Sequence, residues 1–199
     1  MDRLRVYFED SQDGGDQSNF LSQFGTPDTQ DGICFNLVLK WLQLYCANGQ
    51  QIAPNKVFRE LIKQPDSIRS IAEAQSAYQK EQIIHREDTF VIRYGLGGNM
   101  DKDEFFSPYD FAQVVDHFIQ DQNYKMVEIT LIFDDKSKHA IGIIIHNGRI
   151  YLYDPNVGVM SSDLNNMKEL LEKVPIIYGT IFPHMQLAKG IITNIDYQF

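Results

Sequence analysis

The sequence predicts an α+β fold in which helices pack on an antiparallel sheet. Helical spacing of apolar residues recurs between about residues 32 and 122, whereas runs of β-branched and aromatic residues dominate most of the chain that follows. The dipeptide Asn147-Gly148, between two apolar runs, is a strong signal for a β-hairpin. Because helices come first and strands later, instead of alternating along the chain, we expect an antiparallel sheet.

The first predicted helix is central to the fold. In residues 32–47, apolar side chains recur at spacings of three and four, at Cys34, Leu37, Val38, Trp41 and Tyr45. Further leucines broaden this stripe into a belt, which favours burial on several sides. The other helices are predicted at 54–64, 66–86, 108–122 and 161–173.

The strands and the domain limits follow from the remaining residues. Residues 1–31 are poor in large apolar side chains over most of their length and predict a mobile N-terminal arm, and residues 32–199 predict a single catalytic domain. Strands are predicted at 90–92, 126–133, 138–146, 149–154, 175–183 and 190–197.

Composition limits the classes of function. The net charge of −9 gives no general electrostatic footprint for nucleic acid, and no apolar run reaches the roughly 18 residues of a membrane-spanning helix. The N-terminus has no long apolar core, so we do not expect a Sec-type signal peptide. Cys34 and Cys46, twelve residues apart on one helix, would lie roughly 18 Å from each other, too far for a disulfide. Free thiols suit a reducing compartment.

Cys34 is a candidate nucleophile. It follows a turn signal and begins the apolar-periodic run, and Asp31 is a favourable N-cap residue. In the first turn of a helix, unpaired backbone N–H groups and the positive end of the helix dipole favour a thiolate. The thiolate is the nucleophilic form of cysteine.

His139 and Asp154 are the candidate base and the group that orients it. If Asn147 and Gly148 form a two-residue turn, the numbers of paired residues sum to 295, which places His139 opposite a residue near 156. A carboxylate at Asp154 would then reach the imidazole. Singly, each residue has an ordinary structural explanation, as a buried small hydrophobe, a strand-edge residue or a turn residue. The three together predict a Cys-His-Asp hydrolase.

An oxyanion donor is also required. The backbone N–H of Cys34 is the default, and Gln30 or Asn36 could add a side-chain donor, with Gln30 preferred because it precedes the nucleophile. The remaining histidines share no metal-ligand spacing and two cysteines cannot form a cysteine-rich zinc site, so we expect no cofactor and no metal.

Three short blocks resemble the YopT/AvrPphB-type cysteine proteases. These blocks are Gly32-Ile33-Cys34 with Trp41 seven residues after the cysteine, His139-Ala140-Ile141-Gly142, and Asp154-Pro155-Asn156-Val157-Gly158. They occur in the family's order and span about residues 30–160. The resemblance implies a papain-like fold with the nucleophile on a central helix. It also implies a catalytic triad of Cys34, His139 and Asp154, with an oxyanion side chain shortly before the cysteine, for which Gln30 is the candidate.

The resemblance further implies a bacterial effector, secreted by a specialised system into the host cytoplasm, that cleaves a host protein. The expected partners are that substrate and a secretion chaperone. Two alternatives remain at this point: a glutamine deamidase or transglutaminase-like enzyme with the same triad, and an inactive papain-like binding module.

Overall fold

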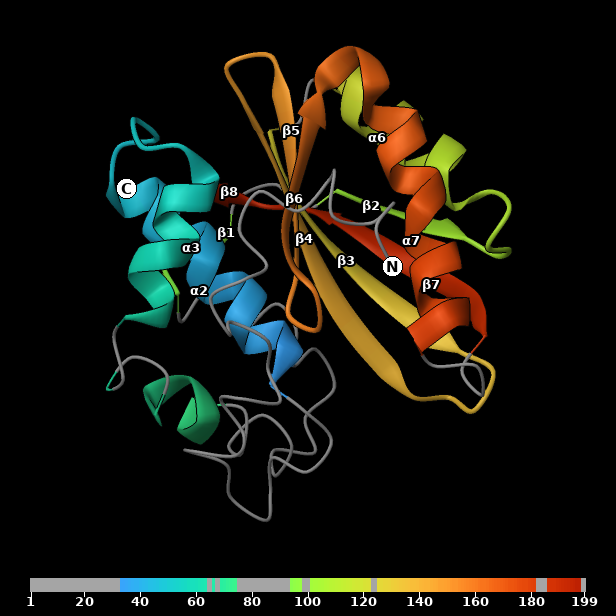
Figure 1. Cartoon of the computed structure of the whole chain (residues 1–199), viewed down its shortest axis with the longest axis horizontal. Helices are drawn as coiled ribbons and strands as arrows, with labels where there is room; N and C mark the ends of the chain where they lie inside the picture. The colour runs from blue at the N-terminus through green and yellow to red at the C-terminus, as the bar shows by residue number, and fades with distance from the viewer. Residues whose placement is uncertain are drawn as a thin grey trace.

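The computed structural model describes residues 33–63, 66, 69–74, 94–97, 101–122, 125–181 and 186–197. Within these ranges the fold has three layers, with helices on both faces of a central sheet (Figure 1). The six-stranded sheet has the order β2-β7-β3-β4-β5-β6, and every pair of neighbouring strands is antiparallel. Its strands are β2 (Lys102–Phe105), β3 (Met126–Phe133), β4 (Lys138–His146), β5 (Arg149–Asp154), β6 (Gly158–Asp163) and β7 (Leu187–Asn194). A separate two-stranded pair joins β1 (Leu96–Gly97) to β8 (Asp196–Tyr197).

The helices lie in two groups. Helices α2 (Cys34–Ala47) and α3 (Pro54–Ile62) cover one face of the sheet, and α6 (Phe111–Gln122) and α7 (Met167–Ile181) cover the other (Figure 1). Because both faces are covered, the central strands carry long apolar runs in which nearly every side chain is buried. The predicted α+β class, with the helix that carries Cys34 packed on an antiparallel sheet, is confirmed.

Each face of the sheet has its own apolar core. On the α2 face, Trp41 is fully buried and its ring packs against that of Tyr153 at 5.3 Å between centroids. The indole N–H of Trp41 also donates a hydrogen bond to the carbonyl of Pro54 at 3.0 Å, which ties α2 to the first residue of α3. On the opposite face, side chains of α6 and α7 pack on the other side of the same strands.

Helix α2 packs on strand β4 at a position that has no side chain. A Cβ built on Gly142 would lie 2.9 Å from Cγ1 of Val38 and 3.3 Å from two ring carbons of Trp41. Both neighbours are fully buried in the core, and Val38 is β-branched with a stiff χ1. The glycine therefore lets the helix approach the strand closely.

The β4–β5 hairpin has the predicted register. His146 pairs with Arg149 and Gly142 pairs with Tyr153, so the paired numbers sum to 295 as expected. Asn147 and Gly148 both have positive φ, at 49° and 72°, which a type I′ turn requires. The predicted bounds of β3, β4 and β5 are confirmed.

The prediction for residues 161–183 is wrong in two places. Residues 161–163 belong to strand β6 instead of a helix, and residues 175–181, predicted as a strand, continue helix α7. Pro175 and the β-branched residues beside it favoured a break followed by a strand. Tertiary packing overrides these local signals, because Val174, Ile177 and Tyr178 continue the buried helical stripe through the proline.

The start of α2 also differs from the prediction. The N-cap is Ile33, whose apolar side chain makes no capping hydrogen bond, so the expected Asp31 cap is wrong, and Cys34 is the first helical residue. Residues 66 and 69–74 are helical, in agreement with the predicted third helix. The N-terminal arm predicted for residues 1–31, the rest of the third helix and the strand predicted at 90–92 lie outside the described residues.

Within the described ranges, no helix combines the length and the apolar character needed to cross a bilayer.

The close approach at Gly142 predicts a specific stability defect. Gly142→Ala should destabilise the protein by about 1–3 kcal/mol, because the new methyl group overpacks against Val38. Gly179→Ala is the matched control, since a Cβ at Gly179 meets nothing within 4 Å and alanine favours a helix. Urea unfolding of the purified variants would measure both effects.

Val38→Ala should partly rescue Gly142→Ala, because it removes the methyl group that the new Cβ meets. The double mutant should then be less destabilised than the sum of the two single mutants. Additive losses would show that the contact does not limit the packing.

Candidate active site

Cys34 lies at the N-terminus of α2 with its sulfur in contact with backbone N–H groups. The amides of Phe35 and of Ala140 on β4 both hydrogen bond to the sulfur. The first N–H groups of a helix have no intrahelical acceptor. Since Ile33 offers no capping oxygen, the sulfur of Cys34 serves as an acceptor for one of these donors.

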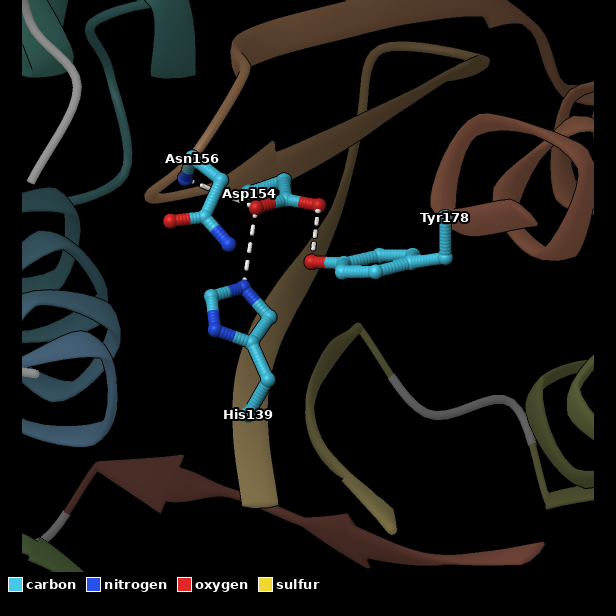
Figure 2. Close-up of polar contacts among 4 residues, drawn as sticks. All are labelled: His139, Asp154, Asn156 and Tyr178. Atoms are coloured by element: carbon cyan, nitrogen blue, oxygen red, sulfur yellow. Dashed lines mark hydrogen bonds and ion pairs between the residues drawn. The ribbon is translucent and has the colours of Figure 1, made fainter. Parts of the chain in front are cut away.

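His139 lies near the start of β4 and is buried, with 5% of its surface exposed. Its side chain hydrogen bonds to Cys34 on one side. On the other side, Nε2–H donates to Oδ1 of Asp154 at 2.9 Å (Figure 2). The imidazole therefore bridges the cysteine of α2 and the carboxylate of β5.

Asp154 is the last residue of β5 and is almost fully buried. Besides His139, its Oδ1 accepts the backbone N–H of Asn156 at 2.8 Å, in the turn that follows the strand. This local bond is an Asx-type turn, which explains the Asp-Pro-Asn sequence at the end of the strand. The contact between His139 and Asp154 that the hairpin register predicted is present, and His139 also hydrogen bonds to Cys34.

Opposing effects act on the thiol of Cys34. Burial raises its pKa, but the charge of His139, the hydrogen bond from His139 and the two backbone amides lower it. The net result is a pKa below the ordinary value for cysteine. This shift favours the thiolate, which is the nucleophile.

The imidazole of His139 shows the complementary shift. Burial lowers its pKa, but the negative charges of Asp154 and Cys34, with the hydrogen bonds to both, raise it well above the ordinary histidine value. A lowered thiol pKa beside a raised imidazole pKa describes a thiolate–imidazolium pair over a broad pH range. Such a pair titrates as a unit.

The two candidates for the oxyanion side chain have different outcomes. Gln30 lies outside the described residues. Asn36 is fully buried in the first turns of α2, and its side-chain oxygen accepts the hydroxyl of Tyr94 at 3.0 Å. This bond links α2 to a residue two positions before β1.

Two residues of the site were missed by the sequence analysis. The hydroxyl of Tyr178, on α7, donates to Oδ2 of Asp154 at 2.8 Å (Figure 2). The side chain of Asn156 hydrogen bonds to the same hydroxyl. Tyr178 lies in the segment 175–183, which the sequence predicts as a strand but which continues helix α7 as far as Ile181. The signal that could have found it is the helical spacing of Leu170, Val174 and Tyr178 through Pro175.

The second cysteine has different surroundings. Cys46 is a free thiol in the last turn of α2, where burial raises its pKa to about 12. Its sulfur contacts that of Met126 at 3.3 Å. Cys34 is also free, so the expectation of no disulfide between them is confirmed.

Within the part of the chain that the structure describes, no group of three or more His, Cys, Asp and Glu side chains is arranged to hold a metal ion.

Comparison with known proteins matches this chain to a family model and to solved structures. The family model for peptidase C58, described as the Yersinia/Haemophilus virulence surface antigen, matches residues 4–180. The crystal structure of the Pseudomonas avirulence protein AvrPphB superposes with a TM-score of 0.68 at 15% identity, covering 88% of this chain and 99% of that chain. At this identity the match shows a shared fold.

A double-glycine motif protease from an AMS/PCAT transporter, solved with its leader peptide, also matches. Its TM-score is 0.29 at 8% identity, covering 81% of this chain and 83% of that chain, which is too low to compare the sites. Among curated proteins, none matches this chain.

The two cysteines should differ sharply in reactivity. At about pH 6, iodoacetamide should alkylate Cys34 much faster than Cys46, because only the pKa of Cys34 is lowered. Peptide mass spectrometry after timed quenching would give both rates. Equal rates, or a faster reaction at Cys46, would contradict an activated thiolate at Cys34.

His139→Ala should reverse the pKa shift of Cys34 instead of merely cancelling it. Burial, the largest influence on Cys34, would remain and would raise the pKa of the thiol above its ordinary value. Alkylation of Cys34 should then require alkaline pH. A variant that still reacts rapidly at about pH 6 would show that the helix N-terminus alone holds the thiolate.

Proposed function

Given that this chain belongs to the peptidase C58 family and is a cysteine peptidase of the YopT type, we propose that it cleaves a host cytosolic protein through a triad of Cys34, His139 and Asp154. The observation that carries this proposal is the contact between the Cys34 thiol and the His139 imidazole, in which the thiol pKa falls and the imidazole pKa rises. A structural cysteine buried in a core has the opposite shift, as Cys46 does.

Each group then has a defined role. The thiolate of Cys34 attacks the carbonyl carbon of the scissile amide, and the protonated His139 gives its proton to the leaving amine. The acyl-enzyme that remains is hydrolysed by water, from which His139 removes a proton. Asp154 keeps Nε2 of the imidazole occupied, so the other ring nitrogen serves the reaction.

The oxyanion of the tetrahedral intermediate needs donors beside the nucleophile. The backbone N–H of Cys34, at the positive end of α2, is the donor that we assign, with the side chain of Gln30 as the second. The side-chain oxygen of Asn36 accepts from Tyr94, two residues before β1, and we choose Gln30 for this role because it precedes the nucleophile.

The family description and the free thiols support a proposal for the place of action. The matching model describes a virulence antigen, and both cysteines are free thiols. Free thiols suit a reducing compartment such as the cytosol. We therefore propose that the protein is delivered into a host cell by a specialised secretion system, with a secretion chaperone as a partner, and acts there on a protein.

The proposed cleavage can be tested without knowing the substrate. Host-cell lysate is incubated with the wild type or with Cys34→Ala, and new protein N-termini are profiled by mass spectrometry. N-termini that appear only with the wild type would support cleavage. Gains of about 1 Da at glutamine, without new N-termini, would instead identify a deamidase on the same scaffold.

The triad residues should differ in the severity of their loss. Cys34→Ala and His139→Ala should abolish cleavage, because the nucleophile or the proton carrier is absent. Asp154→Ala should leave measurable activity, since packing still holds the imidazole, with a loss of up to about ten-thousand-fold by analogy with serine triads. Full activity of Asp154→Ala would exclude an orienting role for this carboxylate.

A further inference from the structure

The two carboxylate oxygens of Asp154 have different hydrogen-bond partners, and one of these partners is a residue outside the triad. Oδ1 accepts His139 and the backbone N–H of Asn156, whereas Oδ2 accepts the hydroxyl of Tyr178 (Figure 2). We propose that Tyr178 is a positioning residue, which fixes the plane of the Asp154 carboxylate and thereby holds His139 in the orientation that pairs with Cys34. This inference rests on the triad of the proposed function.

The carboxylate needs a second anchor because its terminal torsion is soft. The χ2 angle of aspartate has a broad distribution, so bonds to one oxygen leave the other free to swing. Asp154 is 1% exposed, which limits the help that solvent can give to Oδ2. The hydroxyl of Tyr178, at 2.8 Å from Oδ2, supplies the missing constraint from the opposite side of the carboxylate.

The hydroxyl of Tyr178 is itself held in direction. The side chain of Asn156 hydrogen bonds to it, so the phenol oxygen accepts from one neighbour and donates to the other. Burial, followed by the negative charge of Asp154, raises the pKa of Tyr178 well above its ordinary value. Tyr178 therefore stays protonated and remains a donor wherever the thiolate–imidazolium pair exists.

The ring of Tyr178 also touches the base directly. It lies 5.6 Å from the imidazole of His139 and 5.2 Å from the ring of Phe133, measured between centroids. These contacts make Tyr178 part of the core as well. A test must therefore separate the hydroxyl from the ring, which Tyr178→Phe does because it removes only the oxygen.

The titratable groups that face His139 come from three elements. They are Cys34 from α2, Asp154 from β5 and Tyr178 from α7, with Tyr153 of β5 lying near both Cys34 and Asp154. Asp154 and Cys34 raise the pKa of His139, and His139 lowers that of Cys34. A carboxylate that rotates stabilises the imidazolium less. The thiolate–imidazolium pair should then begin to form at a higher pH and be lost at a lower pH than in the wild type.

Iodoacetate is the probe for this range, because it reacts with thiolate and its negative charge is drawn to the imidazolium. Its rate at Cys34 should rise with pH as the thiol ionises and fall again as His139 loses its proton. In Tyr178→Phe the rising limb should move to higher pH and the falling limb to lower pH. The maximal rate should fall about tenfold, as expected for one hydrogen bond to a charged group.

Tyr45→Phe is the matched control. The hydroxyl of the buried Tyr45 is also bonded to a histidine, at 2.9 Å from Nδ1 of the partly buried His146, but outside the site. Its pH profile should match that of the wild type. In an Asp154→Ala background, Tyr178→Phe should cause no further change in the profile, because no carboxylate is left to hold.

The outcomes separate this inference from the proposed function. A Tyr178→Phe profile identical to the wild type overturns the positioning role, while a wild type without a reactive thiolate at acidic pH overturns the triad itself. If Tyr178→Phe does not fold, Asn156→Ala replaces it, since this change removes the amide on the hydroxyl and keeps the backbone N–H on Asp154. It should narrow the profile in the same direction by a smaller amount, and an unchanged profile would again overturn the proposal.

Discussion

The contact between α2 and β4 at Gly142 is the constraint on which the site depends. Cys34, the proposed nucleophile, lies on the helix and His139, the proposed base, lies on the strand, so the distance between them is set by how closely these two elements pack. Val38, one turn after Cys34, rests where a side chain at position 142 would lie. His139, which lies three residues before Gly142 on the same strand, hydrogen bonds to the side chain of Cys34. The glycine thus acts on the chemistry through the packing of the backbone, although it touches none of the reacting atoms.

This packing holds charges that would be unfavourable singly. Cys34, His139 and Asp154 are all buried, and burial opposes the charged form of both the thiol and the imidazole. Each charge is stabilised by its neighbour, so the removal of one partner leaves another buried and uncompensated. Burying these charged groups lowers the stability of the folded protein, and the two apolar cores, one on each face of the sheet, must offset this loss. The same mutual dependence makes the pair reactive, because the thiolate persists only while the imidazolium is held beside it.

The sequence predicted the sheet half of the site better than the helical parts. Strands β3 to β5 and the register of the hairpin followed from apolar runs and from Asn147-Gly148, since turn geometry fixes which residues pair. The contact between His139 and Asp154 could be predicted from the sequence for the same reason. The cap of α2 and the extent of α7 were not, because Ile33 and Pro175 break local preferences that tertiary packing overrides. The roles of the triad and of Gln30 stay predictions.

Tyr178 shows why part of such a site escapes a motif search. It lies 24 residues beyond Asp154, on a helix from the opposite face of the sheet to the nucleophile, and a single hydroxyl connects it to the carboxylate. No fixed spacing links the two, because the length of β6 and the phase of α7 decide where the hydroxyl falls. That phase is set by the buried stripe of Leu170, Val174 and Tyr178. The apolar pattern of a helix thus determines which polar atom reaches the site, and the positioning group is encoded in core packing instead of in a sequence motif.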